Sequence, residues 1–176
     1  MKGLFYYCLT FRAVRGFTLI ELLVVMSVIA IVSTVTVASF VSYSQSSTLK
    51  QGSSDVGNLL RDAKSRTLSQ VKPSNCSGTL DGYRVDICGL TGSTCATQDT
   101  YTLSMVCSST RTVLVTKKLP STASFRQSGT TSVGFTFKVL TNGVIGDGDV
   151  VVGMKNGNTP PPVTITVGQS GSVTVH

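Results

Sequence analysis

Apolar residues run almost without interruption from residue 17 to residue 41. This stretch of 25 residues contains a single charged side chain, Glu21. About 20 apolar residues in a helix are enough to cross a bilayer. Because the stretch is apolar on every side, a helix formed from it must be buried in lipid or in protein. The pattern therefore predicts a membrane-spanning helix over residues 17–41.

A helical period returns after a short polar stretch, but only one face is then apolar. We expect the helix to continue to about residue 72, so that residues 42–72 form its amphipathic part. Asp55 is a candidate cap, Pro73 ends the pattern, and Gly52 and Gly57 are expected to loosen the helix. The stripe residues are Val56, Leu59, Leu60, Ala63, Thr67 and Val71, and the charged face carries Arg61, Asp62, Lys64 and Arg66.

Beyond Pro73 the period of the pattern changes to two, which is typical of strands with one buried face. The strand candidates are 83–87, 101–105, 113–115, 133–139, 149–154, 163–167 and 173–175. The turn signals are Asp81-Gly82, Asn142-Gly143, Asp147-Gly148, Asn156-Gly157 and Pro160-Pro161-Pro162. The sequence predicts an α+β fold, in which an antiparallel β domain of about seven strands over 73–176 packs on the helix stripe.

Composition and charge favour an exported protein. Charged residues make up 13% of the chain, against about 25% in an average soluble domain. The net charge is +7, but Lys2, Arg12 and Arg15 precede the apolar stretch and all eight acids follow it. The positive-inside rule therefore places the N-terminus in the cytoplasm and the C-terminal domain outside. The remaining excess of bases is too small to indicate nucleic-acid binding by itself.

Four of the five cysteines, Cys76, Cys88, Cys95 and Cys107, cluster in the β-rich half, whereas Cys8 stands alone near the N-terminus. An even cluster beyond an export signal predicts two disulfides in an oxidising compartment, and three pairings remain open. Zinc is the alternative. It is disfavoured because the cluster contains no Cys-x-x-Cys pair and the sole histidine is His176.

Glu21 is the unusual residue of the apolar stretch, because an ionisable group inside a membrane helix is costly and indicates a function. A helix N-terminus would tolerate its negative charge but would not explain why it is there. The segment RGFTLIELLVV, residues 15–25, closely resembles the prepilin signature of the type IV pilin family. That family includes type IV pilins, competence pilins and the pseudopilins of type II secretion.

This resemblance implies a processing route and a set of partners. A prepilin peptidase would cut after Gly16, remove residues 1–16 as a leader peptide and methylate the new N-terminal residue, Phe17. Glu21 would direct assembly with other pilin subunits through residues 17–41, helped by a platform protein and an ATPase. The resemblance places the protein in the cytoplasmic membrane and then in an extracellular or periplasmic filament.

Two alternatives explain the apolar stretch without this family. An ordinary signal peptide could be cut near Val37-Ala38-Ser39, which would release a soluble domain. A plain single-span membrane protein would also carry such a helix. Neither explains Gly16-Phe17 together with Glu21. The helix kink of many major pilins is not expected, because no proline occurs between Phe17 and Lys72.

The C-terminal half resembles the H-type pseudopilins and the minor pilins of the FimT/FimU type. The resemblance rests on residues 59–65, 82–85, 135–143 and the last strand with Gly171 and Val173. Some members bind DNA through basic residues near that strand, but residues 171–176 contain no arginine. The DNA-binding candidates are instead Arg111, Lys117, Lys118 and Arg126. A structural filament subunit, a secretion pseudopilin and a DNA-binding minor pilin all remain open.

Other chemistry is not indicated by the sequence. Asn142, Asp147 and Asp149 lie in a glycine-rich segment and are weak calcium candidates, although Asn-Gly and Asp-Gly are first of all turn formers. The chain lacks a plausible Ser-His-Asp set and a Gly-x-x-x-x-Gly-Lys motif, so we expect neither an enzyme nor a cofactor.

Overall fold

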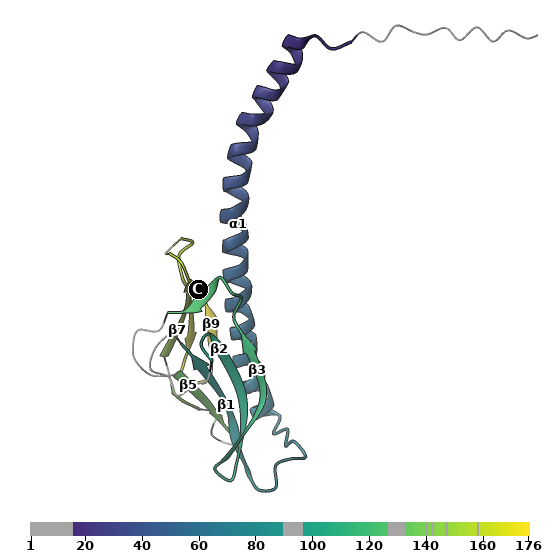
Figure 1. Cartoon of the computed structure of the whole chain (residues 1–176). Coiled ribbons are helices and arrows are strands. Elements are labelled where there is room, and N and C mark those ends of the chain that lie inside the picture. The colour runs from purple at the N-terminus through teal and green to yellow at the C-terminus, as the bar shows by residue number, and fades with distance from the viewer. Residues whose placement is uncertain are drawn as a thin grey trace, which may run out of the picture. The chain divides into compact units, whose positions relative to one another are not determined.

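The computed structural model describes residues 16–89, 97–126, 133–139, 141, 143–146, 148–157 and 159–176, with only the backbone for residues 35–38. One long helix, α1 (Leu19–Leu68), is followed by nine strands (Figure 1). The chain divides into two compact units, residues 1–40 and residues 41–176. The helix belongs to both units, and every strand belongs to the second. The predicted α+β fold is confirmed.

The strands form two antiparallel sheets within the second unit. The first sheet has the order β3-β2-β1-β5-β6 and the second has the order β4-β7-β8-β9. All seven predicted strands are present, and two short strands, β4 and β6, were not predicted. The strands are β1 (Leu80–Cys88), β2 (Thr100–Cys107), β3 (Thr110–Lys118), β4 (Ala123–Phe125), β5 (Val133–Lys138), β6 (Val144–Ile145), β7 (Gly148–Met154), β8 (Val163–Val167) and β9 (Val173–Val175).

The described part of the first unit contains no core. Every side chain described between residues 16 and 40 is exposed, including the large apolar ones. The part of α1 in this unit, residues 19–40, is about 33 Å long at 1.5 Å per residue. That length matches the hydrocarbon core of a bilayer, which is about 30 Å thick. The helix is therefore long and apolar enough to span a membrane.

The core of the second unit forms where the amphipathic part of α1 meets both sheets. The predicted stripe is buried from Val56 to Thr67, and Leu49 extends it toward the N-terminus. Thr67 Oγ1 donates to the Phe137 carbonyl of β5 at 3.4 Å, which ties the end of the helix to the first sheet. The prediction for Val71 is wrong. This residue is 49% exposed because α1 ends at Leu68, before the stripe reaches it.

The expected loosening of α1 at its glycines is also wrong, because the helix is continuous through both positions. Gly52 and Gly57 are buried contact points instead. A Cβ added at Gly52 would lie 3.3 Å from Leu119 and Pro120, and one at Gly57 would lie 3.1 Å from Val175. The two glycines let the segments after β3 and in β9 approach the helix backbone closely.

The predicted turn at Asp81-Gly82 is a third correction, because both residues lie inside β1. The pairing of β1 with β2 shifts register between Leu80 and Gly82. A Cβ at Gly82 would lie 2.1 Å from the Phe137 carbonyl oxygen. The glycine is therefore needed for close strand packing at a bulge, not for a turn.

Candidate processing and assembly site

The start of α1 is fixed by Thr18. Its side-chain oxygen accepts a hydrogen bond from the Glu21 backbone N–H at 3.3 Å, and its carbonyl accepts one from the Leu22 N–H at 3.2 Å. Thr18 is therefore the N-cap, and Glu21 is the third residue of the helix. Thr-x-x-Glu is the sequence pattern of a capping box, so a signal for this helix start was present in the sequence and was missed.

The predicted cleavage site lies just before this cap. Gly16 and Phe17 are outside regular structure, and the Phe17 side chain is 76% exposed. A Cβ added at Gly16 would meet no atom within 4 Å. The peptide bond between them therefore lies in open backbone one residue before the helix cap, where a peptidase can reach it without unwinding a helical turn.

The Glu21 side chain is exposed in the first turn of α1. Free N–H groups at a helix N-terminus carry a partial positive charge, which favours a carboxylate there. Cleavage after Gly16 would add a positively charged α-amine on Phe17, one residue before the cap. The helix start would then hold one carboxylate and one amine, both of which require a partner in an apolar environment.

Three hydroxyl groups further along the apolar part of α1 form hydrogen bonds within the helix and need no partner from outside it. The Ser27 hydroxyl donates to the Val24 carbonyl at 2.7 Å, and the Ser33 hydroxyl donates to the Ile29 carbonyl at 2.7 Å. The Thr34 hydroxyl likewise donates to the Ile31 carbonyl at 2.8 Å. These local bonds satisfy the donors, so the segment stays compatible with an apolar environment. Among the described side chains of 16–40, only Glu21 is ionisable.

A comparison with family models finds a match over residues 11–37, which encloses this whole site. The matching model is the prokaryotic N-terminal methylation motif. The chain therefore carries the signature of type IV pilins and pseudopilins. The motif supports a pilin-like subunit that is processed by prepilin peptidase, which is a structural role. No curated protein and no solved structure matches the chain.

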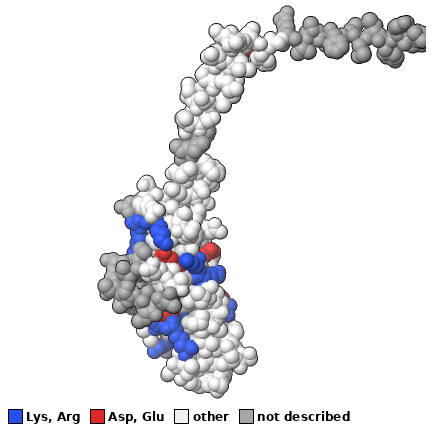
Figure 2. All heavy atoms as spheres, viewed as in Figure 1, with Lys and Arg blue, Asp and Glu red and all other residues white. Residues whose placement is uncertain are grey.

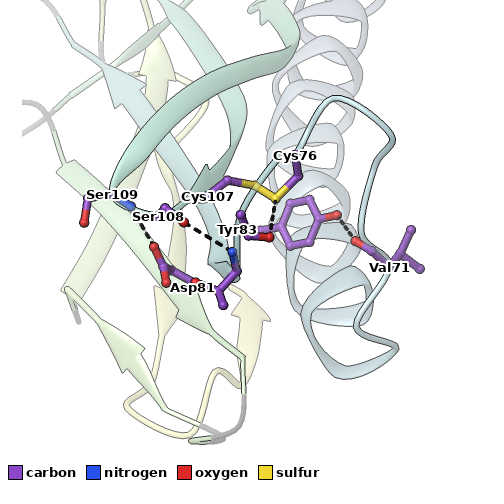
Figure 3. Close-up of a disulfide and its surroundings, with 9 residues drawn as sticks. Val71, Cys76, Asp81, Tyr83, Cys107, Ser108 and Ser109 are labelled. Atoms are coloured by element: carbon purple, nitrogen blue, oxygen red, sulfur yellow. Dashed lines mark hydrogen bonds between the residues drawn. A yellow bond between two sulfur atoms is a disulfide. The ribbon is translucent and has the colours of Figure 1, made fainter.

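One disulfide of the predicted cluster joins Cys76 to Cys107 (Figure 3). It attaches the connection between α1 and β1 to the end of β2. The Tyr83 hydroxyl donates to the Val71 carbonyl in the same connection, as Figure 3 also shows. Burial raises the pKa of the Tyr83 phenol, and Asp62 adds to this effect while Arg66 opposes it.

Cys88 is also disulfide-bonded, whereas Cys95 and Cys8 lie outside the described residues. Of the three pairings that the sequence leaves open, a Cys76–Cys107 bond is compatible only with Cys88–Cys95. We therefore propose Cys88–Cys95 as the second bridge of the cluster.

The four DNA-binding candidates do not form one patch. Arg111 and Lys118 lie near opposite ends of β3, about 24 Å apart along the strand. Arg111 forms an ion pair with Asp86 of β1, and burial, together with nearby Arg84, lowers the pKa of its guanidinium. Arg126 Nη2 donates to the Met154 carbonyl at 2.7 Å and to the Gly157 carbonyl. Two of the four residues thus make structural contacts, and DNA binding remains a prediction.

Lysine and arginine side chains gather on the second unit, and the helix of the first unit is almost free of charge (Figure 2). Of the calcium candidates, Asn142 and Asp147 lie outside the described residues, and Asp149 is exposed in β7. Within the described part of the chain no group of three or more metal-ligating side chains occurs.

Proposed function

We propose that this protein is a structural subunit of a type IV pilus-like filament, cut between Gly16 and Phe17 and assembled through the first half of α1. The observation that supports this most directly is the helix itself. Its large apolar side chains from Leu19 to Val32 are all at least 47% exposed, and the methylation motif covers the same residues. A surface of this kind has to be covered by lipid before assembly and by neighbouring helices afterwards.

The proposed role of Glu21 is to set the position of each subunit relative to its neighbour. In a bundle of apolar helices, the Glu21 carboxylate of one subunit would pair with the Phe17 amine of another. Two charges that are costly when separate become tolerable when paired, so the pair selects one register and adds little net stability. Contacts of this head-to-tail kind do not close and therefore build a helical polymer.

The same proposal gives the location and the partners. The subunit would first sit in the cytoplasmic membrane with a single span and with residues 42–176 outside. Prepilin peptidase, a platform protein and an assembly ATPase would then process it and move it into a periplasmic or extracellular filament. Extraction from the bilayer is feasible because the helix exchanges lipid for equally apolar neighbours.

The test is an intact-mass measurement on sheared surface filaments and on membranes from the same cells. The expected mass corresponds to residues 17–176 plus one methyl group and minus four hydrogens for two disulfides. A chain that begins near Phe40, or that keeps Met1 in both fractions, would contradict the proposal.

The fraction in which the processed chain is found distinguishes a major pilin from a minor pilin or a secretion pseudopilin. Dominance in the sheared fraction indicates the major pilin. Processed chain that stays in the membrane, or reaches filaments only in traces, indicates a minor pilin or a secretion pseudopilin. Neighbouring genes for a secretin and other secretion components would favour the pseudopilin.

A further inference from the structure

A pocket of about 280 Å³ lies within the second unit and takes no part in the proposed processing or assembly. It is formed where the last turns of α1, the hairpin of β5 and β6, and the loop between β8 and β9 meet. Its volume is close to the lower end of the range for small-molecule sites, which is about 300 Å³. The pocket therefore has room for a small organic molecule.

The walls of this pocket are held together by the fold. The Val144 N–H donates to the Gln169 carbonyl at 3.1 Å, which attaches β6 to the loop before β9. Gly171 in that loop is buried and has a φ of 71°. A Cβ added at Gly171 would lie 3.2 Å from Val144 Cγ2 and 3.4 Å from Phe137 Cε1. The loop thus packs directly on two side chains of the pocket, which is formed without any ligand.

The apolar part of the lining includes a side chain that the core does not use. Leu68, the last residue of α1, is 57% exposed and lies outside the core cluster. Phe137 and Val144 line the pocket together with it. The body of an apolar ligand would cover Leu68, and the Phe137 ring offers a favourable contact to another aromatic ring.

The charged part of the lining is entirely positive. Its two charged residues are Lys64 and Lys138, and none of the described lining residues is acidic. Lys64 Nζ donates to the Ser170 carbonyl at 3.2 Å on the pocket wall, which leaves two of its three N–H groups for a ligand. Within the described part of the chain, neither lysine forms an ion pair. The positive charge of the pocket is therefore not neutralised by the residues around it.

The end of α1 does not account for this charge. Lysines are favoured near a helix C-terminus because they interact with its last carbonyl groups. Here the carbonyl groups of residues 65–67 already accept hydrogen bonds from the backbone N–H groups of residues 69–71. The Lys64 amine bonds to the loop between β8 and β9 instead.

We propose that this pocket binds a small organic anion with an apolar body, of the class of the aromatic carboxylates. The ring would cover Leu68 and lie against Phe137 and Val144, and the carboxylate would accept charge-assisted hydrogen bonds from Lys64. Both parts are required, because an apolar wall alone does not select a charge and a lysine alone holds an anion weakly in water. This inference does not depend on the filament proposal.

Benzoate is the probe, and two partial ligands are its controls. Benzyl alcohol has the same ring without the charge, and acetate has the carboxylate without the ring. Each is titrated into the full chain in non-ionic detergent micelles. The methyl NMR signals of Leu68 and Val144 are followed, because a bound ring shifts the signals of the methyl groups that it contacts. We expect saturable shifts with benzoate, and binding of both controls that is about tenfold weaker or less.

Two lysine variants of the same helix locate the site. Lys64→Gln removes the charge, while its amide can still donate to the Ser170 carbonyl, and it should weaken benzoate binding about tenfold. Lys50→Gln makes the same change at an exposed position of α1 that does not line the pocket, and it should leave the affinity unchanged. Thermal unfolding of both variants checks that the fold is kept.

Three results would overturn the inference. The first is the absence of a saturable benzoate shift at both methyl groups. The second is a control ligand that binds as tightly as benzoate. The third is equal benzoate affinity in folded Lys64→Gln and Lys50→Gln chains.

Discussion

Glu21 is the residue on which assembly should depend most. It is the sole acid among residues 17–41, and it lies in the first helical turn, close to the amine that cleavage creates on Phe17. Glu21→Ala leaves the backbone at Gly16 and Phe17 unchanged, so we expect normal cleavage and methylation. It leaves the Phe17 amine of each neighbour without a partner, so we expect filament yield to fall at least tenfold, in line with the cost of an unpaired buried charge, several kcal/mol.

The measurement compares the mass of the processed chain in membranes with the amount in sheared filaments. Ser27→Ala is the matched control, because it removes a hydroxyl group that bonds only locally to Val24 in the same helix. Normal filament yield from Glu21→Ala would show that the proposed charge pair is not required.

Asp99 is a buried acid that joins the two sheets. It is 3% exposed, and its side chain accepts a hydrogen bond from the Phe125 N–H of β4 at 3.2 Å. It also forms an ion pair with Lys155, after β7, at 3.4 Å. We expect Asp99→Ala to lower the free energy of unfolding by about 2–4 kcal/mol, because it leaves a buried N–H group and a cation without their acceptor.

Lys155→Ala is the comparison for Asp99. Its side chain is 48% exposed, and its removal leaves the bond from Phe125 to Asp99 in place. We expect its cost to stay below about 1 kcal/mol. Chemical denaturation of both variants measures the difference, and equal losses would mean that the ion pair, and not the buried hydrogen bond, is the important contact.

Ionisation of Tyr101 should lower the free energy of unfolding at alkaline pH. Burial raises the pKa of its phenol, and Asp55 adds to the effect. Because the folded chain holds this proton more tightly than the unfolded chain, its contribution to stability is complete below the unfolded value, about 10. The contribution is lost as the pH rises through the folded value. Unfolding free energies measured from pH 8 to 11 should fall less steeply for Tyr101→Phe than for the unchanged chain, and identical slopes would exclude Tyr101 as a cause.

At the scale of elements, the long periodic segments could be predicted from the sequence and the short ones could not. The amphipathic part of the helix follows a period of 3.6 and the clearest strands follow a period of two, so their local pattern and their burial agree. Strands β4 and β6 have three and two residues, too few for a period to appear. They are strands because β7 and β5 pair with them.

The hairpin between β2 and β3 shows how contacts distant in sequence fix a turn. Its two loop residues, Ser108 and Ser109, both have positive φ, a conformation for which Asn-Gly would be the usual sequence signal. The Ser109 N–H donates to Asp81 of β1 at 2.9 Å, and the Ser108 hydroxyl accepts from the Thr79 N–H at 3.2 Å (Figure 3). Asp81 was predicted to form its own turn, and it stabilises this one instead. No local pattern contains that information.

The connection between α1 and β1 depends on its disulfide. The bond between Cys76 and Cys107 closes a loop with a sequence separation of 31 residues. The loss of such a cross-link should lower the free energy of unfolding by about 3–4 kcal/mol, since the unfolded chain regains the freedom that the loop removed. Cys76→Ser, Cys107→Ser and the double variant should all show a similar loss in chemical denaturation, because each lacks the same bond. An unchanged unfolding midpoint would mean that the other contacts of this connection are sufficient to hold it.

At the scale of the whole molecule, the residues that form the core and the segment proposed to direct assembly lie in different parts of the chain. Every residue of the core cluster lies between Leu49 and Val173, whereas residues 16–40 expose all of their described side chains. A chain that begins at Val41 keeps the whole core and loses the segment that requires lipid or neighbours. We expect it to be soluble and monomeric without detergent, and to unfold within a few degrees of the full chain in micelles, because no core contact is removed.

Circular dichroism with temperature and sedimentation in detergent-free buffer test this prediction for the shortened chain. The same chain should be absent from filaments when it is exported in cells, since it lacks Phe17, Glu21 and the apolar helix. A shortened chain that is unfolded would show that residues 17–40 stabilise the β domain as well. A shortened chain that is folded but still enters filaments would instead move the assembly surface from the helix to the sheets.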